Sequence, residues 1–230
     1  MGLFYMDQYY LMLVIPAALI ALWAQIKVKS TFNKYNQFKT SRGNTAAMVA
    51  RQILDRNGLQ NVAIERVAGT LSDHYDPRQN VIRLSDTVYN STSVGAIGVA
   101  AHEVGHAVQY ATNYAPIKIR AALIPVTNIG SSIALPLAII GIAMGSQLLT
   151  GVGIILFSAV VIFQLVTLPV EFNASSRAIK TLDEDMLLDG EELAGAKKVL
   201  SAAALTYVAA LIVAIANLLR LILLRNRNRD

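Results

Sequence analysis

The sequence has no cysteine and few charged residues. The absence of cysteine excludes a disulfide framework and any metal site built from thiolates. Charged residues make up 15% of the chain and apolar residues 54%, whereas soluble domains have about 25% charged residues and at most about half apolar ones. The apolar excess is concentrated in three blocks, which a soluble fold of 230 residues could not cover. The sequence therefore indicates a membrane protein.

The longest apolar block, residues 121–170, contains no charged residue. At about 1.5 Å per residue its helix would be too long for one crossing, so two spans of roughly 20 residues are expected. Gly145–Gln147 is the predicted turn, and both ends of this hairpin should emerge on the same side of the bilayer. Residues 9–26 and 200–224 are further candidate spans, which gives about four transmembrane helices.

A cleaved signal peptide is the alternative for residues 9–26. Signal peptides carry positive charge before their apolar stretch, but only Asp7 precedes this one, and Lys27 and Lys29 follow it. No A-x-A cleavage site stands between the apolar stretch and these lysines. The order of the charges favours a retained membrane anchor.

Residues 28–120 have the mixed pattern of a small α+β domain. Apolar spacing and turn residues predict a helix over residues 44–57 and a second helix over residues 92–112. Two short extended segments, residues 61–67 and 80–85, lie between them. The segment 80–85 is either an exposed edge strand that could bind a substrate backbone or an ordinary strand of the sheet.

The composition thus divides the chain into five segments. They are an N-terminal membrane anchor (1–27), an α+β domain (28–120), a transmembrane hairpin (121–170), a polar segment with an acidic centre (171–199), and a C-terminal membrane helix with a basic tail (200–230). Arg220, near the end of the last apolar block, could extend its side chain to the membrane interface.

The segment His102-Glu-Val-Gly-His106 predicts a zinc site. Histidines at i and i+4 project from one face of a helix, so both imidazoles can bind one Zn²⁺. Glu103 stands beside the first histidine, where a carboxylate can take a proton from a metal-activated water. Because the chain has only three histidines, a chance occurrence of this motif is improbable, although two stacked surface histidines are the alternative.

A catalytic zinc commonly takes a third protein ligand, and Glu171 and His74 are the candidates. Glu171 is the first charged residue after the apolar hairpin, which begins about a dozen residues beyond His106 and must return to the same face. Glu171 is therefore favoured, although it could merely end a span. His74, in a turn rich in aspartate and proline, is expected at the surface or behind a ligand.

These motifs together resemble the neutral zinc metallopeptidases of bacterial membranes, the YugP-like family. The resemblance rests on His-Glu-Val-Gly-His, the apolar hairpin and Glu171-Phe-Asn-Ala-Ser-Ser-Arg177, and it covers nearly the whole chain. It implies a mainly α membrane protein with a small α+β catalytic domain of the zincin type, specifically gluzincin-like. It also implies one zinc ion per chain, held by His102, His106 and Glu171.

The chain is more distantly similar to HtpX-type membrane proteases. Those proteins place two spans between the zinc histidines and a later E-x-x-x-D motif. Here Ser175 stands at the position of the aspartate. A serine can still hydrogen-bond a ligand, but it supplies no carboxylate to raise the basicity of an imidazole.

Several residues could have either a catalytic role or a purely structural one. Arg177 could stabilise an oxyanion, or it could face lipid phosphates just beyond a span. Tyr207 could donate to the same oxyanion, or it could simply pack inside an apolar helix. Leu188-Asp-Gly190 resembles a motif of site-2 intramembrane proteases, but it lies in an acidic stretch whose burial in a bilayer would be costly.

The expected function is a membrane-anchored zinc endopeptidase, with Glu103 as general base and then general acid. The alternatives are a non-catalytic membrane scaffold with a structural zinc and a site-2-like intramembrane protease. Expected partners are the lipid bilayer and peptide or membrane-protein substrates; the formal charge of +5 is explained by topology signals rather than by nucleic acid.

The distribution of basic residues predicts a multi-pass protein of the cell membrane with its catalytic side in the cytosol. Residues 27–120 hold twelve of the twenty basic residues. With four spans, however, Arg225, Arg227 and Arg229 would lie outside, against the same rule. Either the last helix does not fully cross the membrane or the charge count is misleading.

Overall fold

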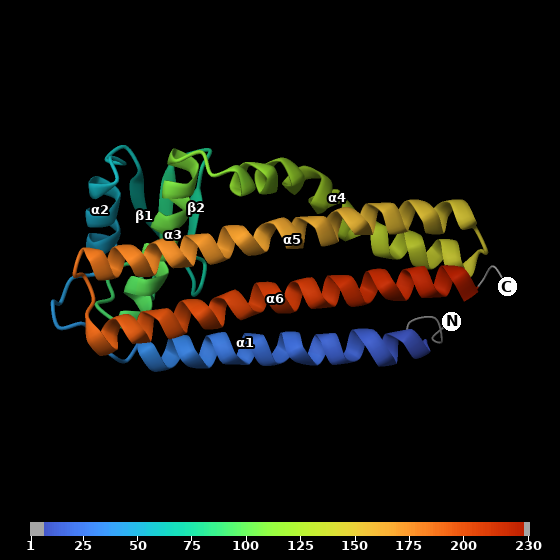
Figure 1. The fold of residues 1–230 in the computed structure, drawn as a ribbon, viewed down its shortest axis with the longest axis horizontal. Coiled ribbons are helices and arrows are strands. Elements are labelled where there is room, and N and C mark those ends of the chain that lie inside the picture. Colours follow the sequence, from blue (N-terminus) through green and yellow to red (C-terminus); the bar gives the residue numbers. More distant parts are fainter. Residues whose placement is uncertain (1–6, 228–230) are drawn as a thin grey trace. The chain divides into compact units, whose positions relative to one another are not determined.

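The protein is mainly helical, with one small three-stranded sheet, as predicted (Figure 1). The structure is a computed structural model that describes residues 7–227, so Arg229 of the predicted basic tail lies outside it. The chain forms two compact units. The helical unit comprises the described parts of Met1–Gln25, Lys118–Pro169 and Thr206–Asp230, and the α+β unit comprises Ile26–Ile117 and Val170–Leu205.

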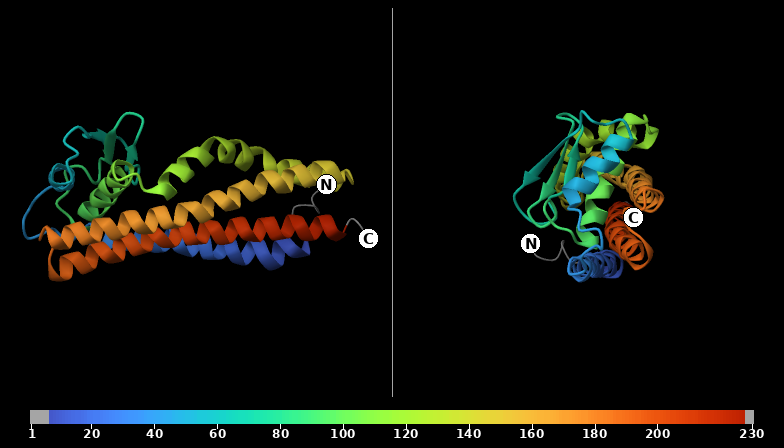
Figure 2. Two further views of the ribbon diagram at one scale, coloured as in Figure 1. Left: turned by 45° about the horizontal axis from the view of Figure 1, so that its top comes forward. Right: turned by 90° about the vertical axis from the view of Figure 1, so that its left-hand side faces the viewer.

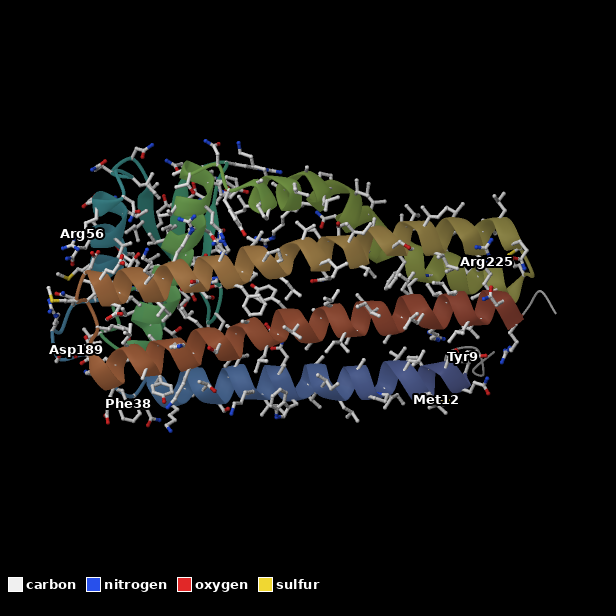
Figure 3. All side chains as sticks on the ribbon, in the orientation of Figure 1. Tyr9, Met12, Phe38, Arg56, Asp189 and Arg225 are labelled. Carbon is white, nitrogen blue, oxygen red and sulfur yellow. The ribbon has the colours of Figure 1, made fainter. Side chains whose placement is uncertain are left out.

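Within residues 7–227, four helices are long and apolar enough to cross a membrane, which confirms the predicted number. They are the helix over Tyr10–Tyr35, whose α-helical part is α1 (Ile15–Tyr35), together with α4 (Ala115–Ala143), α5 (Gln147–Glu184) and α6 (Gly190–Arg227). Each has 26 residues or more, while about 20 suffice to cross the hydrocarbon. In Figure 3 the labelled side chain of Met12, which is 71% exposed, lies on the first turns of this bundle.

Small residues allow the two helices of the hairpin to approach each other closely. A Cβ atom added at Gly153 would lie 2.6 Å from the backbone nitrogen of Ala138. Gly145 turns the chain between α4 and α5 with a φ of +65°, and Ser146 N donates to the carbonyl of Gly141. Without a hydrophobic force between helices in lipid, such backbone proximity and dense packing hold spans together.

The side chain of Arg220, which could have extended to the membrane interface, is buried in the helical unit. Its guanidinium donates to Oδ2 of Asp7 from Nε at 2.8 Å, and Nη2 lies 2.7 Å from the same atom. The two side chains are only 2% and 8% exposed. The guanidinium also lies 5.0 Å from the ring centre of Tyr10. A charge placed among apolar helices is costly unless it is neutralised, and Asp7 neutralises it.

The α+β unit consists of α2 (Ala46–Arg56), β1 (Ala63–Val67), β2 (His74–Asp76), β3 (Val81–Ser85) and α3 (Val94–Ala111), together with the adjoining parts of α1, α5 and α6. Thr45 and Ser93 cap the two short helices by accepting hydrogen bonds from Met48 N and Ala96 N. The sheet lies against α2 and α3 (Figure 2), and Ile82 and Leu84 of β3 enter their common core.

The strand order is β1-β3-β2, with β1 parallel and β2 antiparallel to β3. The segment 80–85 is therefore the central strand, and its reading as an exposed edge strand is wrong. Within β3 (Val81–Ser85) every residue is buried except Arg83. Sequence could not decide this, because an apolar segment of five residues fits either position in a sheet.

Removing the carboxylate of Asp7 should destabilise the helical unit. In Asp7→Asn the buried guanidinium of Arg220 loses its charged acceptor, and we expect a loss of about 3 kcal/mol in the free energy of unfolding. The double variant Asp7→Asn/Arg220→Leu should recover most of that loss. The measurement is unfolding of the purified protein in detergent. Arg225→Gln, at a half-exposed arginine beside Gln147, is the control, and an equal loss in it would contradict the account.

Candidate metal centre

Helix α3 places His102 and His106 on one face, one turn apart. The centres of their rings are 4.7 Å apart and the rings are nearly perpendicular, at 84°. His106 is buried and His102 half-buried. Because α3 is lined with alanine and glycine over this stretch, other segments can pack closely against the histidines.

Glu171 completes the cluster from helix α5. Its Oε2 lies 3.3 Å from Nε2 of His102 and 3.6 Å from Nε2 of His106, and its side chain is only 3% exposed. One potential ligand atom from each of these three residues lies within 4.8 Å of the other two. The structure thus brings together the three side chains that the sequence predicted, although Glu171 lies 65 positions after His106.

The close approach of α3 and α5 depends on Gly105. A Cβ atom added at this position would lie 2.6 Å from the carbonyl oxygen of Ala174 and 3.1 Å from its Cα. Gly105 precedes His106, and Ala174 lies three residues after Glu171, so this contact is at the level of the cluster. Any larger residue at position 105 would have to push the carboxylate away from the imidazoles.

Each histidine is oriented through its second ring nitrogen. Nδ1 of His102 lies 3.1 Å from the Ser175 hydroxyl, and Nδ1 of His106 lies 3.0 Å from Oε1 of Gln109. Because Oε1 can only accept, the Nδ1 of His106 carries a proton, and its Nε2 is the ring nitrogen that faces Glu171. Ser175 thus fulfils the hydrogen-bonding role predicted for it.

Gln109 is the functional residue that sequence reasoning missed. It is fully buried, and its amide nitrogen donates to the carbonyl of Val170 at 2.8 Å and to Oδ1 of Asn173 at 3.0 Å. The same Asn173 oxygen accepts from Nε of Arg177 at 2.8 Å. One amide therefore fixes both the orientation of His106 and the backbone beside Glu171. A polar residue three positions after His106, on an otherwise apolar helix, was the available signal.

The carboxylates of Glu171 and Glu103 shift the pKa values of neighbouring groups. Burial by itself lowers the pKa of His106, but the hydrogen bond with Glu171 and the negative charge of Glu103 outweigh it, so that its pKa is raised. Burial raises the pKa of Asp73, although hydrogen bonds from Ser85 oppose this, and Glu103 adds to the rise. Glu103 is itself buried, at 8% exposed.

The donor set fits a zinc ion. Zinc–ligand bonds of about 2.0–2.1 Å at tetrahedral angles require ligand atoms about 3.3 Å apart, close to the observed 3.3 and 3.6 Å. Two imidazole nitrogens and one carboxylate oxygen are a known catalytic set that leaves one position open. Within residues 7–227 no fourth histidine, aspartate or glutamate belongs to the group.

His74 and Asp189, which the sequence also offered as possible ligands, are not part of the cluster. His74 is exposed on β2, and its Nδ1 is 2.8 Å from the carbonyl oxygen of Ser72. Asp189 lies in the turn before α6 (Figure 3) and is not part of the cluster. Tyr207 belongs to the part of α6 in the helical unit. Arg177 is connected to the cluster through Asn173.

Comparison with known proteins agrees with these features. The family model described as "Putative neutral zinc metallopeptidase" matches residues 10–226. The chain is 50% identical over 221 residues to the "Putative membrane protease YugP" of Bacillus subtilis (strain 168), which covers 96% of this chain and 98% of that protein. No solved structure matches the chain. The resemblance stated from the sequence is confirmed.

Gly105→Ala should weaken metal binding without unfolding the protein. The added methyl group would meet the Ala174 carbonyl and displace α5, and with it Glu171, from the histidines. We expect at least a roughly tenfold lower zinc affinity, since one misplaced ligand costs on the order of 1.4 kcal/mol or more. Competition with a fluorescent zinc chelator measures this change.

Gly98→Ala is the matched control on the same helix. A Cβ atom there would meet Ala196 Cβ at an ordinary 3.4 Å, so zinc affinity should not change. Equal zinc affinities in the two variants would show that the helix contact at Gly105 does not set the geometry of the cluster.

Proposed function

The chain belongs to the neutral zinc metallopeptidase family, and we propose that it is a membrane-anchored endopeptidase that hydrolyses peptide bonds with one zinc ion per chain. His102, His106 and Glu171 would hold the ion. The observation that carries the proposal is the convergence of Nε2 of both histidines and Oε2 of Glu171. The "membrane protease" in the name of the Bacillus subtilis relative supports the same activity.

A zinc ion in such a site supplies Lewis acidity, which polarises a carbonyl group and lowers the pKa of water. Glu103 acts as the general base: it accepts a proton from the attacking water and then donates it to the leaving amine. Its position next to His102 keeps the carboxylate beside the cluster, where it is not itself one of the three ligands. Ser175 and Gln109 hold the two imidazoles in orientation during these transfers.

Two other functions are less well supported. A structural zinc would need a closed fourth position, but His74 is exposed and no fourth ligand belongs to the group within the described residues. A site-2-like intramembrane protease would use Asp189 as a ligand, but that residue lies in a turn in an acidic stretch. Glu171 occupies the position that this alternative would assign to Asp189.

We place the protein in the cell membrane, with the α+β unit on the cytosolic side. The positive-inside rule supports this, because fourteen of the twenty lysines and arginines belong to the α+β unit. Arg220 does not count against it, since Asp7 neutralises its charge in the interior of the helical unit. With four crossings, both ends of the described chain lie on the opposite side, and Arg225 and Arg227 are then exceptions to this rule.

We further propose that the substrates are membrane proteins or peptides close to the bilayer surface. The two units are parts of one chain that is continuous through α1, α5 and α6, so the site cannot leave the membrane. No part of the proposal involves nucleic acid, because the basic residues adjoin the spans and are explained by topology.

Glu103→Gln should abolish cleavage but retain zinc. The amide keeps the shape of the side chain but cannot accept a proton, so the rate should fall at least about 100-fold. Glu171→Gln should instead lose most of the bound zinc, because a neutral amide replaces the charged ligand. Zinc content of purified protein and cleavage of an unfolded casein substrate measure the two effects.

These two variants distinguish the loss of the general base from the loss of a metal ligand. Full activity in Glu103→Gln would refute the role of Glu103 as base. Full zinc content in Glu171→Gln would refute the ligand set, whatever the activity of either variant.

A further inference from the structure

Four lysines from two helices line one groove in the α+β unit. Lys27 and Lys34 come from α1, and Lys197 and Lys198 come from the beginning of α6. The groove has a volume of about 550 Å³, and no acidic residue is among those that line it. Such a concentration of one charge needs an anionic partner or open water to be stable.

The packing of α1 against α6 shapes this groove. A Cβ atom at Gly195 would lie 2.7 Å from the ring of Tyr35, so only glycine lets the two helices approach this closely. Lys27, Thr31 and Lys34 follow at i, i+4 and i+7, which places them on one face of α1. Lys197 and Ser201 face them from α6 with the same helical spacing.

None of the four lysines is neutralised by a carboxylate within residues 7–227. All four are exposed, and Nζ of Lys34 lies 5.6 Å from the ring centre of Tyr35. The acidic side chain of Glu192, near the beginning of α6, instead accepts a hydrogen bond from the backbone of Ser41. The positive charge is therefore available to a ligand.

The groove lies where two apolar runs begin or end. On α1 the apolar run ends at Ile26, directly before Lys27, and on α6 the run begins directly after Lys198. The single tryptophan, Trp23, is 54% exposed one turn before Lys27 on the same helix. Tryptophan is enriched at the membrane–water interface, so these residues are at the depth of lipid headgroups.

From this placement we propose that the groove binds the headgroup of an anionic phospholipid. The ammonium groups pair with the phosphate oxygens, and the hydroxyl groups of Thr31, Tyr35 and Ser201 can donate to them. Leu205 and Ala202 form the apolar end of the groove, toward the acyl chains. An adjoining cavity of about 680 Å³ between α5 and α6 shares Lys197, Ser201 and Leu205, and its lining also includes Lys180 and Asp183. The inference does not depend on the proposed protease activity.

Quenching of Trp23 by brominated lipids tests this proposal directly. The full-length protein is reconstituted in phosphatidylcholine that contains either brominated phosphatidylglycerol or, at the same fraction, brominated phosphatidylcholine. We expect roughly tenfold preferential association of the anionic lipid near Trp23, since each lysine near a headgroup contributes to binding. Equal quenching by the two brominated lipids would overturn the proposal.

Three variants test whether the preference for the anionic lipid arises from the groove. Lys27→Gln/Lys34→Gln/Lys197→Gln/Lys198→Gln should remove it, while replacement of the same four lysines by arginine should keep it. The control, Lys29→Gln/Lys39→Gln/Arg42→Gln/Arg78→Gln, removes the same charge from exposed positions of the same unit outside the groove and should keep the preference. A loss in the control equal to that in the groove variant would show only general attraction and would overturn the site.

Inorganic phosphate distinguishes the source of the ligand. Millimolar phosphate in the buffer should leave the preferential quenching unchanged, because the lipid is held by its acyl chains at high local concentration. If phosphate abolished it, the groove would be a site for a soluble phosphate compound and the lipid assignment would be wrong.

Discussion

The site depends on one buried contact: the carboxylate of Glu171 placed between the Nε2 atoms of two histidines. An ionised carboxyl group that is 3% exposed would be strongly destabilising if nothing compensated it. The two imidazoles, at 3.3 and 3.6 Å, compensate it through shared protons, and a divalent cation would do so more completely. Burying this carboxylate therefore destabilises a fold that binds no metal, whereas a bound metal ion would offset the cost. Gly105, Gln109 and Ser175 all serve to maintain this contact.

The site also explains why a membrane hairpin separates its two halves. His102 and His106 precede the apolar block 121–170, and Glu171 follows it, on the same helix α5 that forms the second arm of the hairpin. A hairpin returns the chain to the side it left, so the ligand from α5 can reach α3 within the α+β unit. Pro169 lies inside α5 two residues before Glu171, and α5 nevertheless continues unbroken to Glu184. In the proposed topology, membrane insertion of the hairpin and assembly of the site are therefore linked.

Much of this could be predicted because the signals were local or strongly periodic. The four spans followed from long apolar runs, the two histidines from helical spacing, and the helices over 46–56 and 94–111 from caps and turn residues. The choice of Glu171 over His74 needed only the argument that a hairpin returns to its starting side.

What could not be predicted depended on tertiary packing. Whether 80–85 was a central or an edge strand depended on pairing with β1 and β2, which no pattern within five residues encodes. The burial of Arg220 depended on Asp7, more than 200 residues away, which is in contact only because their helices are packed together. Gln109 was missed because a polar residue in a helix has many roles, and only the position of Val170 and Asn173 identifies this one.

X-ray absorption spectroscopy of the zinc-loaded protein tests the central claim most directly. The account predicts one zinc ion with two imidazole ligands and only oxygen atoms in its remaining positions, because the chain has no cysteine and His74 is exposed away from the cluster. A spectrum that requires three imidazole ligands, or purified protein that retains no bound zinc, would contradict it.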